Sequence, residues 1–133
     1  MVVSSSEGPG SVSRVKCSAA VRGRGTAVVS LYRHLAPLTV DAIGWALPMD
    51  SRVSVQPGMV SMFTTIKVGV EKPRLAFTKG EVAFLASGGL LCFFVGDVKS
   101  AMPLNPVGKV DAGLEVLESL KRGDVIRLAK EED

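Results

Sequence analysis

The chain has 133 residues, of which 47% are hydrophobic and 22% are charged, and its net charge is +3. This length suits one domain with a substantial core, and the hydrophobic fraction excludes an intrinsically disordered chain. The basic residues are spread along the sequence rather than clustered, so neither nucleic acid nor a membrane surface is expected as a partner.

The sequence contains no candidate membrane segment or export signal. Its apolar runs are shorter than the roughly 18 residues that a transmembrane helix needs. The first ten residues lack both the basic start and the apolar stretch of a secretory signal, so we expect a cytoplasmic protein. Amide side chains are limited to Gln56 and Asn105, and this scarcity suggests a thermophilic source.

The first third of the chain predicts a tail followed by a hairpin. Residues 1–12 are rich in Ser and Gly, which is typical of a flexible N-terminal tail, and a single domain is expected over 13–129. Val15–Val21 alternates apolar with polar residues, and Thr26–Tyr32 is rich in strand formers. The RGRG sequence between them reads as a turn, because a basic RNA-binding tract would need interleaved aromatic residues.

A short helix is predicted between Pro37 and Pro48. Thr39 is the expected N-cap, and the apolar residues that follow it recur at helical spacing. Trp45, the only tryptophan, is interpreted as a packing anchor rather than a ligand stack, because an aromatic beside an apolar stripe usually belongs to the core. His34 has no partner that would make it a base or a metal ligand, so a surface or packing role is expected.

The middle of the chain predicts several strands. Residues 52–68 form a strand block that Pro57-Gly58 interrupts, and 71–80 reads as a loop with a short edge strand. Two apolar runs, 82–86 and 90–95, then flank a Ser-Gly-Gly turn. In the second run Leu90, Cys92 and Phe94 would share one face of a strand, and the residues between them the other. Both faces are apolar, which favours a closed barrel whose outside is partly covered.

The last third predicts a loop, a helix and a closing strand. Two prolines make 97–106 a predicted loop, and apolar spacing predicts a helix over 110–121 with Asp111 as its cap. Residues 125–128 form the closing strand, and 130–133 an acidic tail. The expected fold is mainly β: a closed antiparallel β-barrel capped by two short helices.

The sequence lacks the motifs of common enzyme classes. It has no phosphate-binding loop, dinucleotide fingerprint or nucleophile elbow, and the carboxylates of Glu115 and Glu118 fall on an exposed helix face. Cys17 and Cys92 are the only cysteines, and without metal-ligand spacing they are interpreted as small buried hydrophobes. We therefore expect no metal and no cofactor.

Several segments resemble the cyclophilins. GEVAFLA (80–86) and SGGLLCFFVG (87–96) look like the cyclophilin strand pair, PVGKVDAGLEVLESL (106–120) is similar to the segment that begins the second cyclophilin helix, and RGDVIRL (122–128) looks like the closing strand. The chain resembles still more closely a family of small bacterial and archaeal cyclophilin-like proteins without assigned function. This resemblance implies a cyclophilin-like barrel.

The resemblance also implies a site. Arg52 begins the strand that carries the catalytic arginine of cyclophilins, although a solvated strand-end arginine is its ordinary interpretation. The pocket implied by the resemblance places Arg52 at the rim of one apolar concavity. Two of its positions, Cys92 and Leu104, stand where cyclophilins have Gln and His. The residues expected to bind a ligand are Met62, Phe84, Cys92, Phe94 and Leu104.

Two functions follow from these residues. The favoured one is a binding module for a small molecule or a proline-containing peptide, without efficient isomerase activity, because most polar groups of the cyclophilin site are replaced. The alternative is a minimal peptidyl-prolyl cis-trans isomerase that relies on Arg52 and an apolar pocket at Phe94. A homodimer formed through an exposed edge strand is compatible with either function.

Overall fold

The computed structural model describes residues 14–131, which include the whole of the predicted domain except residue 13. The predicted N-terminal tail (1–12) and the last two residues of the predicted acidic tail lie outside the described residues. No helix among the described residues is long and apolar enough to span a membrane. The strands are β1 (Arg14–Val21), β2 (Gly25–Tyr32), β3 (Met49–Gln56), β4 (Met59–Phe63), β5 (Arg74–Phe77), β6 (Glu81–Leu85), β7 (Leu90–Phe94), β8 (Val98–Ala112) and β9 (Val125–Lys130).

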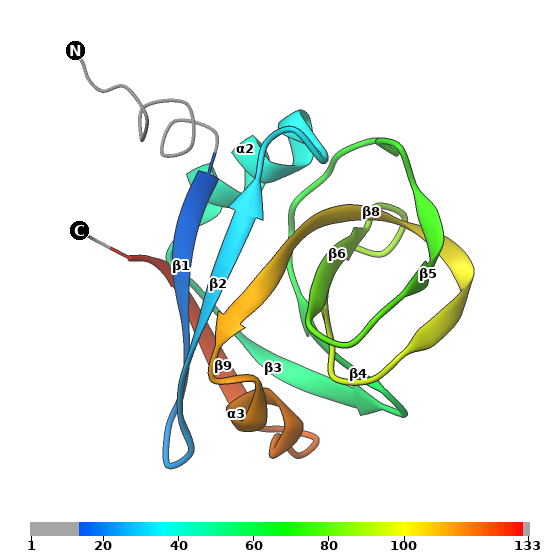
Figure 1. Cartoon of the computed structure of the whole chain (residues 1–133). Coiled ribbons are helices and arrows are strands. Elements are labelled where there is room, and N and C mark those ends of the chain that lie inside the picture. The colour runs from blue at the N-terminus through cyan, green and yellow to red at the C-terminus, as the bar shows by residue number, and fades with distance from the viewer. Residues whose placement is uncertain (1–13, 132–133) are drawn as a thin grey trace.

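Eight of these strands form a closed antiparallel barrel (Figure 1). The order around it is β2-β1-β9-β3-β4-β7-β6-β8, and pairing of β8 with β2 closes the ring, while β5 pairs with β8 outside it. Gly108 lies at the closure, and a Cβ atom there would come within 1.9 Å of the Ser30 carbonyl oxygen. Only glycine lets the two backbones approach this closely. The structure thus confirms the predicted mainly β, closed-barrel fold.

Two short helices pack at opposite ends of β2. The helix α2 (Pro37–Ala46) follows the end of β2 and buries Val40 and Ile43, whereas α3 (Leu114–Glu118) lies at its start and buries Val116 and Leu117 (Figure 1). A Cβ atom on Gly25 would lie 3.2 Å from Val116, so α3 sits directly against the β1–β2 turn. Each helix adds side chains to the barrel core, as predicted for the two caps.

Neither predicted helix cap is correct. The N-cap residue of α2 is Ala36, whose own side chain makes no capping hydrogen bond. Instead, the Glu71 carboxylate accepts hydrogen bonds from the backbone N–H groups of Leu38 (3.1 Å) and Thr39 (2.7 Å). This cap comes from a loop more than thirty residues away, which local sequence cannot show. Burial raises the pKa of Glu71, but the hydrogen bonds from Thr39 outweigh it and leave the pKa lowered.

The second predicted helix is shorter than expected. Residues 110–112 belong to β8, where Val110 pairs with Val29 of β2, and the helix begins only after Gly113. Gly113 has a φ of 79°, and a Cβ atom there would lie 2.7 Å from Ala27 Cα. Strand pairing and this close contact therefore override the helical spacing, and Asp111 accepts a hydrogen bond from the Ser30 hydroxyl instead of capping a helix.

The predicted loop over 97–106 is wrong, because most of it lies in β8. Pro106 pairs with Ala83 where the register between β6 and β8 shifts, and Pro103 lies beside a second shift against β5. Proline removes a donor from the ladder, so it is tolerated at such irregularities. The strand can therefore contain both prolines and bend from the barrel wall to the outer strand β5.

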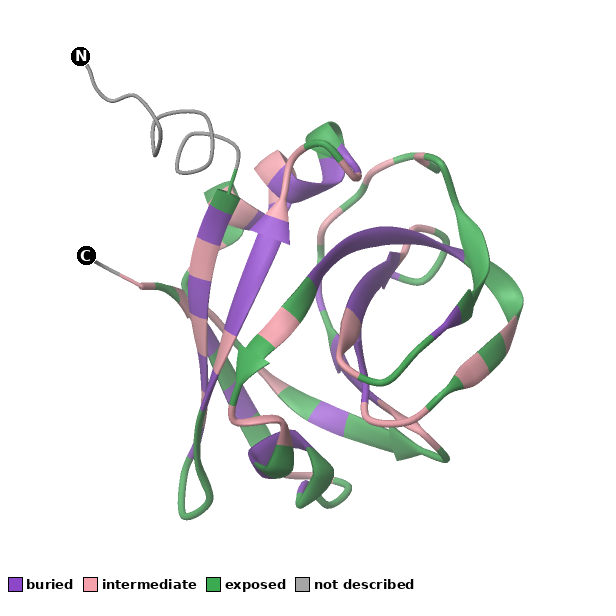
Figure 2. Cartoon of the chain, in the orientation of Figure 1, coloured by how far each residue is buried: buried purple, intermediate pink, exposed green. Residues whose placement is uncertain are grey.

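The buried side chains form two clusters. The larger one, the barrel core, is lined by alternate residues of the strands, as the stripes of β1 show in Figure 2. Trp45 does not belong to it: its exposed fraction is 84%, so the predicted packing role is wrong. Val40 and Ile43 already fill the inward face of α2 and leave Trp45 and Leu38 outside. The smaller cluster, the outer cluster, comprises Phe77, Ala83, Cys92, Phe94 and Leu104.

Candidate functional site

The structure separates the predicted ligand-binding residues into two groups. Met62 and Phe84 point into the barrel and are completely buried in its core. Cys92, Phe94 and Leu104 lie in the outer cluster, on the other side of the barrel wall. The structure therefore does not bring the expected residues together in one concavity.

The alternation of β7 explains this division. Leu91 and Phe93 belong to the barrel core, while Cys92 and Phe94 belong to the outer cluster with Leu90 packed against it. The faces predicted for this strand are thus confirmed. Met62 and Phe84 pair with Leu91 across the ladders, which places them on the inner face.

The outer side of Phe94 is covered by another part of the chain. The ring of Phe77, on β5, stacks on Phe94 with 4.6 Å between centroids and 6° between planes, and both side chains are buried. Phe94 is the residue on which the resemblance would place a proline ring. Phe77 occupies that apolar surface, so the surface is closed to a ligand in this structure.

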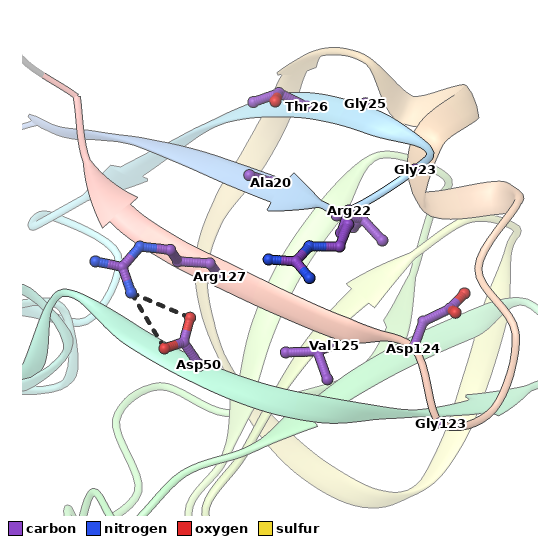
Figure 3. Close-up of a pocket in the computed structure, with 11 residues that line it drawn as sticks. Ala20, Arg22, Gly23, Gly25, Thr26, Asp50, Gly123, Asp124, Val125 and Arg127 are labelled. Carbon is purple, nitrogen blue, oxygen red and sulfur yellow. Dashed lines mark hydrogen bonds and ion pairs between the residues drawn. The ribbon is translucent and has the colours of Figure 1, made fainter.

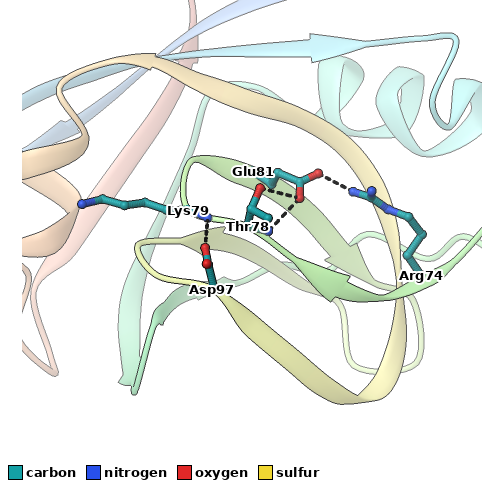
Figure 4. A network of polar contacts seen from close by, with 5 residues as sticks. All are labelled: Arg74, Thr78, Lys79, Glu81 and Asp97. Carbon is teal, nitrogen blue, oxygen red and sulfur yellow. Dashed lines mark hydrogen bonds and ion pairs between the residues drawn. The ribbon is translucent and has the colours of Figure 1, made fainter.

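A polar network holds the Phe77 segment in place (Figure 4). Arg74 donates a hydrogen bond to Glu81 and lies 4.8 Å from the centroid of the Phe77 ring. Glu81 also accepts hydrogen bonds from the backbone and hydroxyl of Thr78, at 2.8 and 3.2 Å. Burial raises the pKa of Glu81, but the bonds from Thr78 and Arg74 outweigh it and leave the pKa lowered. The carboxylate is therefore kept charged beside Arg74.

Arg52 lies in an open part of the outer surface. It is exposed on β3, and its guanidinium makes no hydrogen bond or ion pair with any described residue. Its ladder partner on β9 is Val125. On the other side of β3, Val53 pairs with Met62 of β4, and Phe63 is the next residue of β4. The exposed fractions of Val125 and Phe63 are 46% and 62%. Within the described part of the chain, Arg52 is thus an unpaired cation between two exposed apolar side chains.

Phe63 and Phe77 were not identified from the sequence as site residues. Phe63 follows the buried Met62 on β4, and the alternation of side chains along a strand alone predicts that Phe63 lies outside the barrel. Nothing in the local sequence indicates that Phe77 packs on Phe94, because the contact joins two strands that are not neighbours in the sheet.

The two thiols are buried and unreactive as nucleophiles at neutral pH. Burial raises the pKa of both Cys17 and Cys92 to about 12, so neither is a thiolate at neutral pH. Within residues 14–131, no three His, Cys, Asp or Glu side chains gather as a metal site would require. The chemistry available around Arg52 is therefore that of its guanidinium and its apolar neighbours: charge attraction, hydrogen-bond donation and apolar contact.

Comparison with known proteins assigns this chain to a family. The sequence pattern of the family described as cyclophilin-like matches residues 16–129. The solution structure of the hypothetical protein AF2241 from Archaeoglobus fulgidus is similar, with 22% identity over 90% of this chain and 96% of that one and a TM-score of 0.75. No curated protein sequence matches this chain.

A second solved structure has the same fold. It is McbB in complex with tryptophan, with 16% identity and a TM-score of 0.73; the match covers 88% of this chain but only 45% of McbB. At these identities both structural likenesses show the fold alone. With the family pattern spanning nearly the whole barrel, the chain belongs to the cyclophilin-like family, whose function is unassigned.

Proposed function

We propose that this protein is a binding module for a small ligand or peptide and that it does not isomerise prolyl bonds efficiently. The observation that carries the proposal is the contrast between two neighbouring parts of the outer surface. The surface at Phe94 is filled by Phe77, whereas Arg52 and Phe63 remain exposed. The second part can hold a ligand, but the first cannot hold a proline ring.

Arg52 and Phe63 suit a ligand with one acceptor group and one apolar group. The unpaired guanidinium supplies up to five N–H donors for a carbonyl or carboxylate oxygen. Phe63 offers an exposed apolar ring on the next strand, and an exposed proline or aliphatic side chain of a peptide would pack on it. A peptide carbonyl followed by an apolar residue matches this arrangement.

Catalysis needs more than this surface provides. Twisting a prolyl amide crosses a barrier of roughly 18–20 kcal/mol, and only groups that bind the twisted state more strongly than the planar one lower it. At the Gln and His positions of the cyclophilin site this chain has Cys92 and Leu104, both buried in the outer cluster. Arg52 is the remaining donor, and its freedom from ion pairs is the observation that favours the alternative, a minimal isomerase.

The proposal is tested by titrating the full chain with an Ala-Pro test peptide and following backbone amide signals by NMR. We expect the signals around Arg52 and Phe63 to shift, while those of Phe94 and Leu104 stay unchanged. In Arg52→Ala the affinity should fall about fivefold or more, since a charge-assisted hydrogen bond is lost. Arg14→Ala removes an exposed arginine at a remote strand end and should bind like the wild type. Shifts confined to residues elsewhere, or equal affinity in Arg52→Ala, would contradict the proposal.

A further inference from the structure

A recess lies on the outer surface, where the β1–β2 hairpin meets β9 and β3 (Figure 3). Its volume is about 860 Å³, and Arg52 does not line it. Two of its walls are glycine turns: at Gly23 and Gly123 an added Cβ atom would meet nothing within 4 Å. On β1 the small side chain of Ala20 stands opposite Arg127 and adds little bulk. The recess therefore has room for a ligand larger than a single ion.

The two carboxylates that line this recess are already paired with arginines. Asp50 accepts two hydrogen bonds from Nη1 of Arg127, at 3.1 and 3.2 Å, and Asp124 accepts one from Nε of Arg24 at 2.8 Å. Each lining carboxylate is thus matched by one arginine. Arg22 also lines the recess, but its guanidinium has no partner among the described residues. Because Arg24 pairs with Asp124 from outside the lining, no described carboxylate matches the positive charge of Arg22.

The donors of Arg127 are only partly used. Both of its bonds to Asp50 come from Nη1, so Nε and Nη2 make no hydrogen bond with the described residues. Figure 3 shows the Arg22 side chain extending across β9 on the side where Arg127 and Asp50 also lie. Two guanidinium groups with free donors therefore line one cavity, which is the arrangement that favours a group with several anionic oxygens.

We propose that this recess binds a small organic phosphate monoester. Such a group carries a charge of about −1.5 to −2 at pH 7 and three acceptor oxygens, which Arg22 and the free donors of Arg127 can share. Val125 lines the same recess and is 46% exposed, so an apolar organic part can pack on it. This proposal does not depend on the function proposed for the Arg52–Phe63 surface, because the two sites use different arginines, although Val125 borders both.

The test is an NMR titration of the full chain at pH 7.5 and low salt with two probes, inorganic phosphate and phenyl phosphate. We expect both probes to shift the amide signals of 22–25 and 123–127, with phenyl phosphate bound more tightly. Arg22→Ala should weaken phenyl phosphate binding about tenfold. Arg14→Ala, which removes an exposed arginine from the far end of the strand that leads into Arg22, should leave it within twofold.

A third variant tests the apolar contact. Val125→Thr keeps the branched shape that suits a strand, and it should reduce the preference for phenyl phosphate over inorganic phosphate severalfold without weakening inorganic phosphate. Equal weakening by Arg22→Ala and Arg14→Ala would mean that only general surface charge attracts the probes, and it would overturn the proposal. An absence of shifts at 22–25 would also overturn it. Binding of the Ala-Pro peptide at Arg52 should be the same in Arg22→Ala, so the two proposals can fail separately.

Discussion

Replacing Phe93 by alanine should lower the free energy of unfolding by about 3–5 kcal/mol, the usual cost of deleting a packed aromatic side chain. Phe93 is completely buried, and its ladder partners Val60 and Val82 lie in the same barrel core. The loss combines the apolar surface no longer buried with the cavity that the surrounding strands cannot close. Urea denaturation followed by circular dichroism gives the change in midpoint.

The matched control is Phe63→Ala on the adjacent strand. Phe63 is 62% exposed, so its removal creates no cavity and should change the free energy of unfolding by less than about 1 kcal/mol. A midpoint for Phe93→Ala close to that of the wild type, or a loss equal to that of Phe63→Ala, would contradict the assignment of Phe93 to the barrel core.

Asn105→Leu should be similarly costly, at about 3–5 kcal/mol, although the two side chains have the same number of non-hydrogen atoms and the same branching. Asn105 is completely buried and donates hydrogen bonds to Gly69 O (2.9 Å) and Thr39 Oγ1 (3.1 Å) while accepting one from Glu71 N (2.8 Å). Leucine would leave these partners without it, and each buried unsatisfied group costs about 1–3 kcal/mol. The free energy of unfolding from urea denaturation measures the loss.

Hydrogen exchange distinguishes this network from ordinary packing. Asn105 positions Glu71, whose carboxylate caps α2, so Asn105→Leu should also speed exchange of the Leu38 and Thr39 amides. Gln56→Leu is the control, because Gln56 is exposed and makes no side-chain hydrogen bond with the described residues. A stable Asn105→Leu variant with unchanged exchange in α2 would show that the network does not hold the helix.

Much of the barrel is predictable from the sequence because successive side chains of a strand point alternately into the core and out of it. The two faces of Leu90–Phe94 assign Phe93 to the core and Phe94 to the outer cluster without any structure. The hairpin β1–β2, the turn at Pro57-Gly58 and the short strand β5 also follow from local patterns. In each case the residues that determine the element are neighbours in the chain.

The errors arise where distant contacts decide the structure. Residues 110–112 have helical spacing, but pairing with β2 makes them a strand. The apolar stripe predicts Trp45 in the core, but Ile43 and Val40 fill that side of the helix. The cap of α2 comes from Glu71, far along the chain. No local pattern contains this information.

The candidate site shows the same limit. The sequence predicts a strand at Arg52, which lies in β3, and the alternation of β7 correctly predicts that Cys92 and Phe94 share one face. The expected pocket nevertheless combined inner residues, Met62 and Phe84, with outer ones, because a residue list taken from a resemblance does not state which side of the wall each occupies. Phe77 covers Phe94 because β5 pairs with β8 outside the barrel, and only the structure shows this pairing.

The most direct test of the binding-module account is a protease-free isomerisation assay on a Xaa-Pro peptide, with wild type, Arg52→Ala and Phe77→Ala. We expect wild type and Arg52→Ala to leave the relaxation at its uncatalysed time of tens to hundreds of seconds. Loss of one preorganised donor costs about 10²–10³ in rate at comparable electrostatic sites, and here several are missing. Phe77→Ala uncovers Phe94 but restores no polar group, so it too should stay inactive. Rapid turnover by the wild type that disappears in Arg52→Ala would contradict the account and establish the protein as an isomerase.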